Sequence, residues 1–148
     1  MVDNFYENPN EVRDFALSCD FVSHPQYHKG KRTEEQYIPD TIKEKFERLL
    51  HCEIVNWEAH SANGVFQYCT AEDKLVYHVD SQAYAAVVYL TPDAPASCGT
   101  TFFKSGRTGL RGSPTKEDCE KLNKSEEELS FEIFKNNFYD KTNLEVVE

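Results

Sequence analysis

Residues 78–103 read HVDSQAYAAVVYLTPDAPASCGTTFF, and this stretch decides the predicted fold. Its centre, YAAVVYL at residues 84–90, is apolar at both alternating positions, which is typical of a central strand covered on both faces. Pro92 and Pro95 end this strand because proline has no N–H to donate to a β-ladder. TTFF at residues 100–103 predicts the next strand, so we expect a strand, a turn and a second strand.

The segments on either side of this stretch add further expected strands. They are short, rich in Val, Tyr, Phe and Thr, and separated by turn-prone residues such as SANG and TAED. They are CEIVNW at 52–57, VFQYC at 65–69 and KLVYHVD at 74–80. KTNLEVVE at 141–148 has the character of the start of one more strand.

Two helices are expected before the strands. Asn8 followed by Pro9 is a cap residue followed by proline at the first helical position. Apolar residues at helical spacing then continue to about Cys19. Asp40 or Thr41 can cap a second helix. Its apolar stripe consists of Ile42, Phe46, Leu49 and Leu50.

A helical insert is expected near the end of the chain. Ser125 and Glu128, three residues apart, form the pattern of a capping box. The acidic residues that follow Ser125 suit the positive end of a helix dipole. The expected buried side consists of Phe131, Phe134 and Phe138.

Length and composition indicate one folded domain over residues 1–148, with 39% apolar and 13% aromatic residues. The net charge of −10 argues against a nucleic-acid partner, because phosphate binding needs clustered Lys and Arg. No run of eighteen apolar residues predicts a membrane span, and the polar start does not have the pattern of a signal peptide. Five widely spaced cysteines without a C-x-x-C predict reduced thiols in a cytoplasmic protein and disfavour a structural zinc site.

His78 and Asp80 are the candidate metal ligands. Side chains at positions i and i+2 of a strand point to the same face, so this imidazole and this carboxylate project together. They can fill two adjacent corners of an octahedral metal ion, and a third protein ligand would complete a facial triad with open positions. The H-x-D pattern is short, and the other interpretation of these residues is a polar strand end that begins a turn.

The strand, turn and strand that follow the pair strengthen the metal interpretation. The stretch from His78 to Phe103 resembles the core of the iron(II)- and 2-oxoglutarate-dependent dioxygenases of the prolyl-hydroxylase-like kind. The resemblance runs from about Asn4 to Gly109 and is most specific between Val65 and Phe103. Cys98 stands where that family often has the first glycine of a Gly-Gly-Thr-x-Phe-like segment.

This resemblance implies an α+β fold, a jelly-roll double-stranded β-helix with N-terminal helices and the C-terminal helical insert. It implies Fe(II) as cofactor and 2-oxoglutarate as cosubstrate, which is converted to succinate and CO2 while a small-molecule or peptide substrate is hydroxylated. By position, Tyr68 matches the tyrosine that often contacts 2-oxoglutarate; its other interpretation is a core aromatic. The hard chemistry would belong to the metal and the cosubstrate.

One element of the family pattern is missing from this sequence. The family completes its triad with a later histidine, and no histidine follows Asp80. The earlier histidines do not match that position; they are His24, His28, His51 and His60. The basic residues Lys104, Arg107 and Arg111 could meet an anionic substrate, but a solvated loop is the interpretation we favour.

Three explanations of the missing ligand remain open. The chain is truncated at its C-terminal end, it is completed by a second chain or by another copy of itself, or it no longer binds iron. The alternative to an oxygenase is therefore a non-catalytic or partner-completed jelly-roll module that engages another protein. An unrelated all-β domain, in which the H-x-D is accidental, is the third hypothesis.

Overall fold

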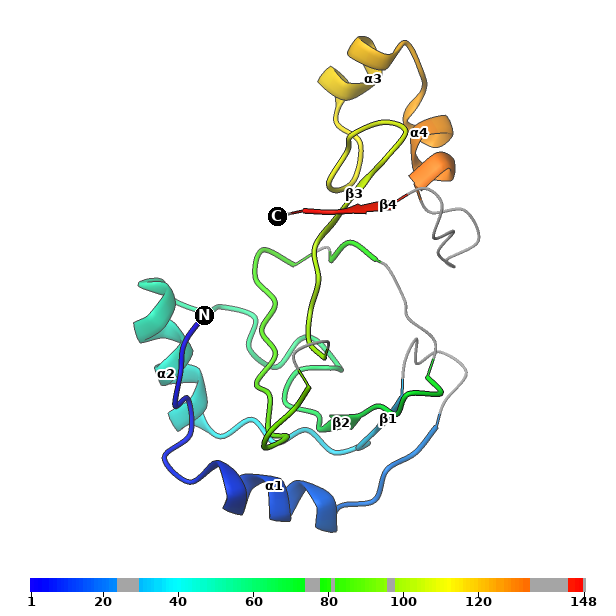
Figure 1. Ribbon diagram of the computed structural model, residues 1–148. Helices are drawn as coiled ribbons and strands as arrows, with labels where there is room; N and C mark the ends of the chain where they lie inside the picture. The colour runs from blue at the N-terminus through cyan, green and yellow to red at the C-terminus, as the bar shows by residue number, and fades with distance from the viewer. Residues whose placement is uncertain (24–29, 74–77, 81, 96–97, 134–143, 148) are drawn as a thin grey trace. The chain divides into compact units, whose positions relative to one another are not determined.

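The computed structural model describes residues 1–23, 30–73, 78–80, 82–95, 98–133 and 144–147. It divides into two compact units, Met1–Lys74 and Leu75–Glu148. The described part is a small mixed α/β protein with four helices and two antiparallel sheets of two strands each (Figure 1). No helix in this part is long and apolar enough to cross a membrane.

In the first unit, helix α1 spans Pro9–Ser18, as the sequence predicts. Pro9 takes the first helical position, where its missing N–H costs no hydrogen bond. The Asn8 side chain makes no capping hydrogen bond, so proline placement and the buried Ala16 account for this helix. The helix ends at Cys19, whose backbone N–H donates to the carbonyl of Ala16.

Helix α2 spans Asp40–Leu50, and the cap predicted at Asp40 or Thr41 is wrong by one or two residues. Pro39 is the cap residue, and Asp40 lies inside the first turn, where the helix dipole favours a carboxylate. Phe46 packs from α2 against Phe5 at 4.9 Å and Trp57 at 6.0 Å between ring centroids. These two ring contacts connect α2 to Phe5, which precedes the helix in the sequence, and to Trp57, which follows it.

A short sheet completes the first unit. Strand β1, Lys31–Arg32, pairs antiparallel with β2, Gln67–Tyr68, so that Lys31 lies opposite Tyr68. The predicted strand VFQYC is confirmed at Gln67 and Tyr68, whereas no strand was predicted at β1. The predicted strand CEIVNW is wrong: these residues form turns after α2, where the chain reverses at the left-handed His51.

Gly30 explains why the chain can approach β2 so closely. Its φ is +67°, and a Cβ built there would lie 2.2 Å from the carbonyl oxygen of Tyr68. Glycine alone accepts both the left-handed backbone and this contact.

The second unit contains strand β3, Phe103–Ser105, paired antiparallel with β4, Leu144–Val146 (Figure 1). The strand expected at the end of the chain is confirmed at 144–146. Its partner β3 shares only Phe103 with the predicted strand TTFF, whose residues 100–102 form no strand. Lys104 lies opposite Glu145, and their Nζ and Oε2 atoms are 2.9 Å apart.

Two helices lie between these strands in the sequence. Helix α4, Glu126–Ile133, begins with the predicted capping box: Ser125 Oγ accepts from the Glu128 N–H at 3.1 Å, and Glu128 accepts from the Ser125 N–H at 2.8 Å. Phe131 is 61% exposed, so its predicted burial is wrong; Leu129, fully buried, takes that role. Phe134 and Phe138 lie outside the described residues.

Helix α3, Lys116–Leu122, was not predicted, although its signal is of the same kind. Thr115 and Asp118 form a complete capping box: the Thr115 hydroxyl accepts from the Asp118 N–H at 3.2 Å, and Asp118 accepts from the Thr115 N–H at 2.9 Å. Aspartate at the third position serves in place of the usual glutamate.

The predicted buried central strand at residues 84–90 is wrong. These residues form no strand, and the side chains of Tyr84, Val87 and Tyr89 are 63%, 67% and 61% exposed. A strand needs hydrogen-bonded neighbours, and no described residue pairs its backbone with this segment. Accordingly, the described residues form no closed barrel.

Candidate metal-binding pair

His78 and Asp80 lie in the second unit with their side chains side by side. The distance from His78 Nε2 to Asp80 Oδ1 is 3.3 Å, and the two side chains are 61% and 45% exposed. Residues 78–80 form no strand, so the predicted strand KLVYHVD is not confirmed in its described part, although the two side chains lie close together. The lead-in residues 74–77, also part of the predicted strand, lie outside the described residues.

The donor set fits part of a metal site. With metal–ligand bonds of about 2.1 Å, adjacent corners of an octahedron lie about 3 Å apart. The 3.3 Å separation of the two donor atoms is close to that requirement. Both side chains are exposed enough to reach an ion from solvent. The pair can thus supply one nitrogen and one oxygen to a divalent cation, in competition with a proton on the imidazole.

A third ligand is not provided by the described residues. Among them, no three His, Cys, Asp or Glu side chains are gathered to hold a metal ion. His51 ends α2, and His60 Nδ1 accepts a hydrogen bond from the Ala62 N–H at 3.2 Å. His24 and His28 fall outside the described residues. Of the expected facial triad, the described residues bring together His78 and Asp80 alone.

Tyr68, the expected 2-oxoglutarate contact, belongs to β2 of the first unit. Its ring meets Phe21 edge-on at 5.0 Å, and the Lys31 ammonium lies 6.0 Å from its centroid. These neighbours make Tyr68 part of the aromatic surface of the short sheet. Its role toward a cosubstrate stays a prediction.

The described residues that follow 84–90 turn back toward that segment. The Tyr89 hydroxyl and Thr100 Oγ1 are 2.6 Å apart, and the Cys98 N–H donates to the Pro95 carbonyl at 2.8 Å. The two ends of the loop, at residues 89 and 100, thus approach each other. The predicted order of strand, turn and strand is not confirmed, because neither Tyr89 nor Thr100 lies in a strand.

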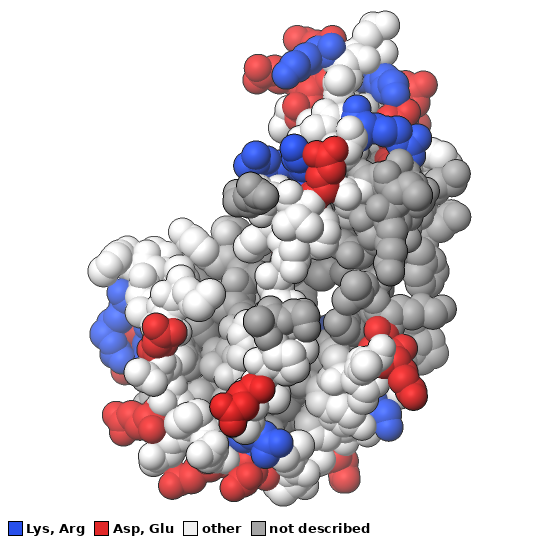
Figure 2. Space-filling view, in the orientation of Figure 1, with Lys and Arg blue, Asp and Glu red and all other residues white. Residues whose placement is uncertain are grey.

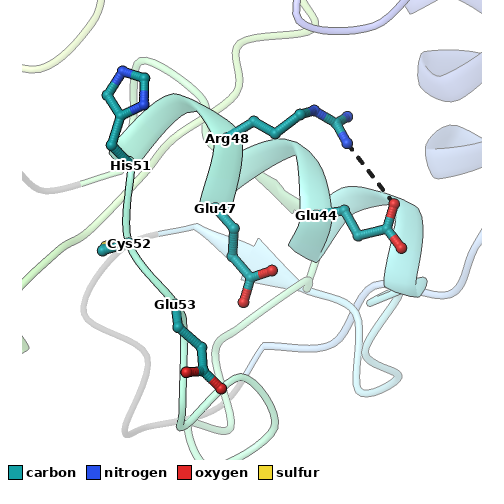
Figure 3. A pocket seen from close by; sticks show the side chains of 6 residues that line it. All are labelled: Glu44, Glu47, Arg48, His51, Cys52 and Glu53. Atoms are coloured by element: carbon teal, nitrogen blue, oxygen red, sulfur yellow. Dashed lines mark ion pairs between the residues drawn. The ribbon is translucent and has the colours of Figure 1, made fainter.

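A surface hollow of about 540 Å³ opens at the C-terminal end of α2 (Figure 3). It is lined by Glu44, Glu47, Arg48, His51, Cys52 and Glu53. Arg48 pairs with Glu44 at 3.8 Å, and Glu47 accepts from the Ile54 N–H at 2.9 Å. Figure 3 shows the side chains of His51 and Glu53 pointing in opposite directions. These groups serve the end of the helix and form no catalytic constellation.

A cluster that the sequence did not predict surrounds Tyr37. Its hydroxyl accepts from the Cys19 thiol at 3.3 Å and donates to Glu35 Oε2 at 3.0 Å. The hydrogen bond with Cys19, then burial and Glu35, raise the pKa of the Tyr37 phenol above its ordinary value. The phenol therefore stays protonated. Its ring packs against Phe15 and Phe66, so this cluster joins α1 to the chain before β2.

Charged side chains of both signs are interspersed on the face shown in Figure 2. Lys104 is neutralised by Glu145 across the β3–β4 ladder. All five cysteines are unbridged, as the reduced-thiol prediction requires. Comparisons with models of protein families, with curated protein sequences and with solved structures found no match to this chain.

Proposed function

We propose that this chain is an iron(II)- and 2-oxoglutarate-dependent oxygenase of the hydroxylase type. The observation that carries the proposal is the 3.3 Å approach of His78 Nε2 and Asp80 Oδ1 on exposed side chains. It is supported by the likeness of residues 78–103 to the core of that family. The proposal includes the jelly-roll architecture over one domain and a cytoplasmic location.

In this proposal His78 and Asp80 hold the metal at two adjacent positions. The metal and 2-oxoglutarate supply the oxidising chemistry, with succinate and CO2 as coproducts. The imidazole of His78 and the carboxylate of Asp80 would hold the metal together with a third ligand, and the bound metal would bind the cosubstrate and oxygen. The substrate class is a small molecule or a peptide.

An anaerobic titration tests the proposal. Fe(II) added to the protein with 2-oxoglutarate should produce a weak visible charge-transfer band, which His78→Ala and Asp80→Ala should each abolish. Two protein ligands hold the ion weakly, so the titration must extend to high metal concentration. A band that forms with the unaltered protein and is lost in both variants supports the pair.

Matched controls exist elsewhere in the chain. His51→Asn keeps a residue that tolerates the left-handed backbone at φ +53°, and Asp14→Ala removes an exposed carboxylate from α1. Both controls should keep the band. A band that persists in His78→Ala and Asp80→Ala, or its absence from the unaltered protein, contradicts the proposal.

The second candidate is a non-catalytic module that engages another protein or another copy of itself. The exposed apolar side chains of Tyr84, Val87, Tyr89 and Phe102 favour it, because they are 63%, 67%, 61% and 75% exposed and a partner chain would cover them. Sedimentation equilibrium should show self-association that Val87→Asp weakens. A chain that stays monomeric at every concentration rules out the form completed by a second copy.

A further inference from the structure

The turn that follows β3 is unusually well fixed for an exposed loop. We name residues 105–111 the arginine turn. The Ser105 N–H donates to the Leu110 carbonyl at 2.8 Å, and the Gly109 N–H donates to the Ser105 carbonyl at 2.7 Å. The Thr108 N–H donates to the buried Ser105 hydroxyl at 3.3 Å. Three hydrogen bonds thus anchor the turn on one buried residue at the end of a strand.

Gly109 permits this geometry. Its φ is +73°, and a Cβ there would meet no atom within 4 Å. A substitution would therefore strain the backbone without creating a clash. A substitution at Gly109 therefore changes the backbone conformation of the turn without changing its charges.

The two arginines of the turn lack partners in the described part of the chain. Arg107 and Arg111 are exposed, and no described carboxylate lies within ion-pair distance of either. Lys104, three residues before Arg107, is neutralised by Glu145 at 2.9 Å. In a chain of net charge −10, two guanidinium groups on one fixed turn thus remain without an anion among the described residues.

The N–H groups of Gly106 and Arg107 donate to no acceptor among the described residues, whereas those of Thr108 and Gly109 are used inside the turn. The planar guanidinium matches the oxygens of phosphate and carboxylate. The anchoring hydrogen bonds distinguish this turn from an exposed loop whose arginines are merely solvated.

We propose that Arg107 and Arg111 of the arginine turn bind an oxyanion, the phosphate or carboxylate group of an anionic ligand. The site requires neither a metal nor the proposed oxygenase activity. It differs from the solvated loop that the sequence favoured, because Ser105 fixes the turn before any ligand arrives. Preorganised donors lose less conformational freedom when the anion binds.

Inorganic phosphate and malonate are the two probes. Each is titrated into the ¹⁵N-labelled full chain without metal, to about 10 mM, and the amide signals of Gly106 and Arg107 are followed. At least one probe should shift both signals in a saturable way, and the comparison shows whether phosphate or carboxylate is preferred. Added salt should weaken binding, because the contacts are exposed.

Three variants test the assignment. Arg107→Gln and Arg111→Gln should each raise the Kd about tenfold, the loss expected for one charge-assisted contact. Gly109→Ala keeps both arginines and should also weaken binding. Arg48→Gln makes the same change of charge on the exposed surface of α2 and should leave the Kd unchanged. No saturable shift with either probe, or an equal loss in Arg48→Gln, overturns the proposal.

Discussion

The ion pair between Lys104 and Glu145 gives the sharpest test of the β3–β4 register. Its charged atoms are 2.9 Å apart, which corresponds to about 1.4 kcal/mol of Coulomb energy in the dielectric of bulk water. The side chains are 37% and 58% exposed, so the cost of ordering them lowers the net value. Measured exposed pairs fall at about 0.2–1 kcal/mol, and we expect about 0.5 kcal/mol here.

A double-mutant cycle isolates that energy. The free energy of unfolding in urea is measured for the unaltered chain, Lys104→Gln, Glu145→Gln and the double variant. The coupling should be favourable at low salt and should shrink toward zero near 1 M salt, where the screening length is about 3 Å. The charge-exchanged variant Lys104→Glu/Glu145→Lys should recover part of the loss.

The same cycle with Lys121 in place of Lys104 serves as the negative control. A coupling below about 0.2 kcal/mol at low salt, or one equal to that of the control, would show that these residues are not opposite each other in solution. The register Lys104↔Glu145 would then be wrong, and with it the position of β4.

The remaining predictions concern caps and close contacts. Thr115→Ala should destabilise α3 by about 1 kcal/mol, measured as lost helical circular dichroism. The hydrogen bonds from Thr115 lower the pKa of the Asp118 carboxyl below its ordinary 3.8, so its contribution is complete above pH 3.8 and is lost as pH falls through the lowered value. The difference between Thr115→Ala and the unaltered chain should therefore shrink in acid; a constant difference would contradict this. Gly30→Ala should lower the urea midpoint by the equivalent of more than about 1 kcal/mol, because its Cβ meets Tyr68; an unchanged midpoint would refute the contact.

Local signals predicted the helices better than the strands. Pro9 and the Ser125–Glu128 pair act within one helical turn, so the residues that define each helix start are neighbours in the sequence. The strand expected at residues 84–90 depends on backbone partners far away, and apolar alternation alone does not provide them. β1 was not predicted, because its two residues, Lys31 and Arg32, are polar and form a strand only through backbone pairing with β2.

In the candidate site, too, contacts between sequence neighbours were predictable and contacts between distant residues were not. The adjacency of His78 and Asp80 was predictable because it depends on a spacing of two residues. The contact of Tyr37 with Cys19 joins residues eighteen positions apart, and no short pattern announces it. A third metal ligand would also come from a distant part of the sequence, so the three-residue motif cannot predict it.

The pairing of β3 with β4 also bears on the order of folding. The ladder closes a loop of about 38 residues, 106–143, whose closure is entropically costly before any contact between the strands forms. Replacing that excursion with a tight turn of about four residues would lower the closure cost by about 2 kcal/mol. The ladder should therefore tolerate changes in the length of the intervening sequence, which makes this excursion the natural place for evolutionary insertions and for grafting a foreign peptide.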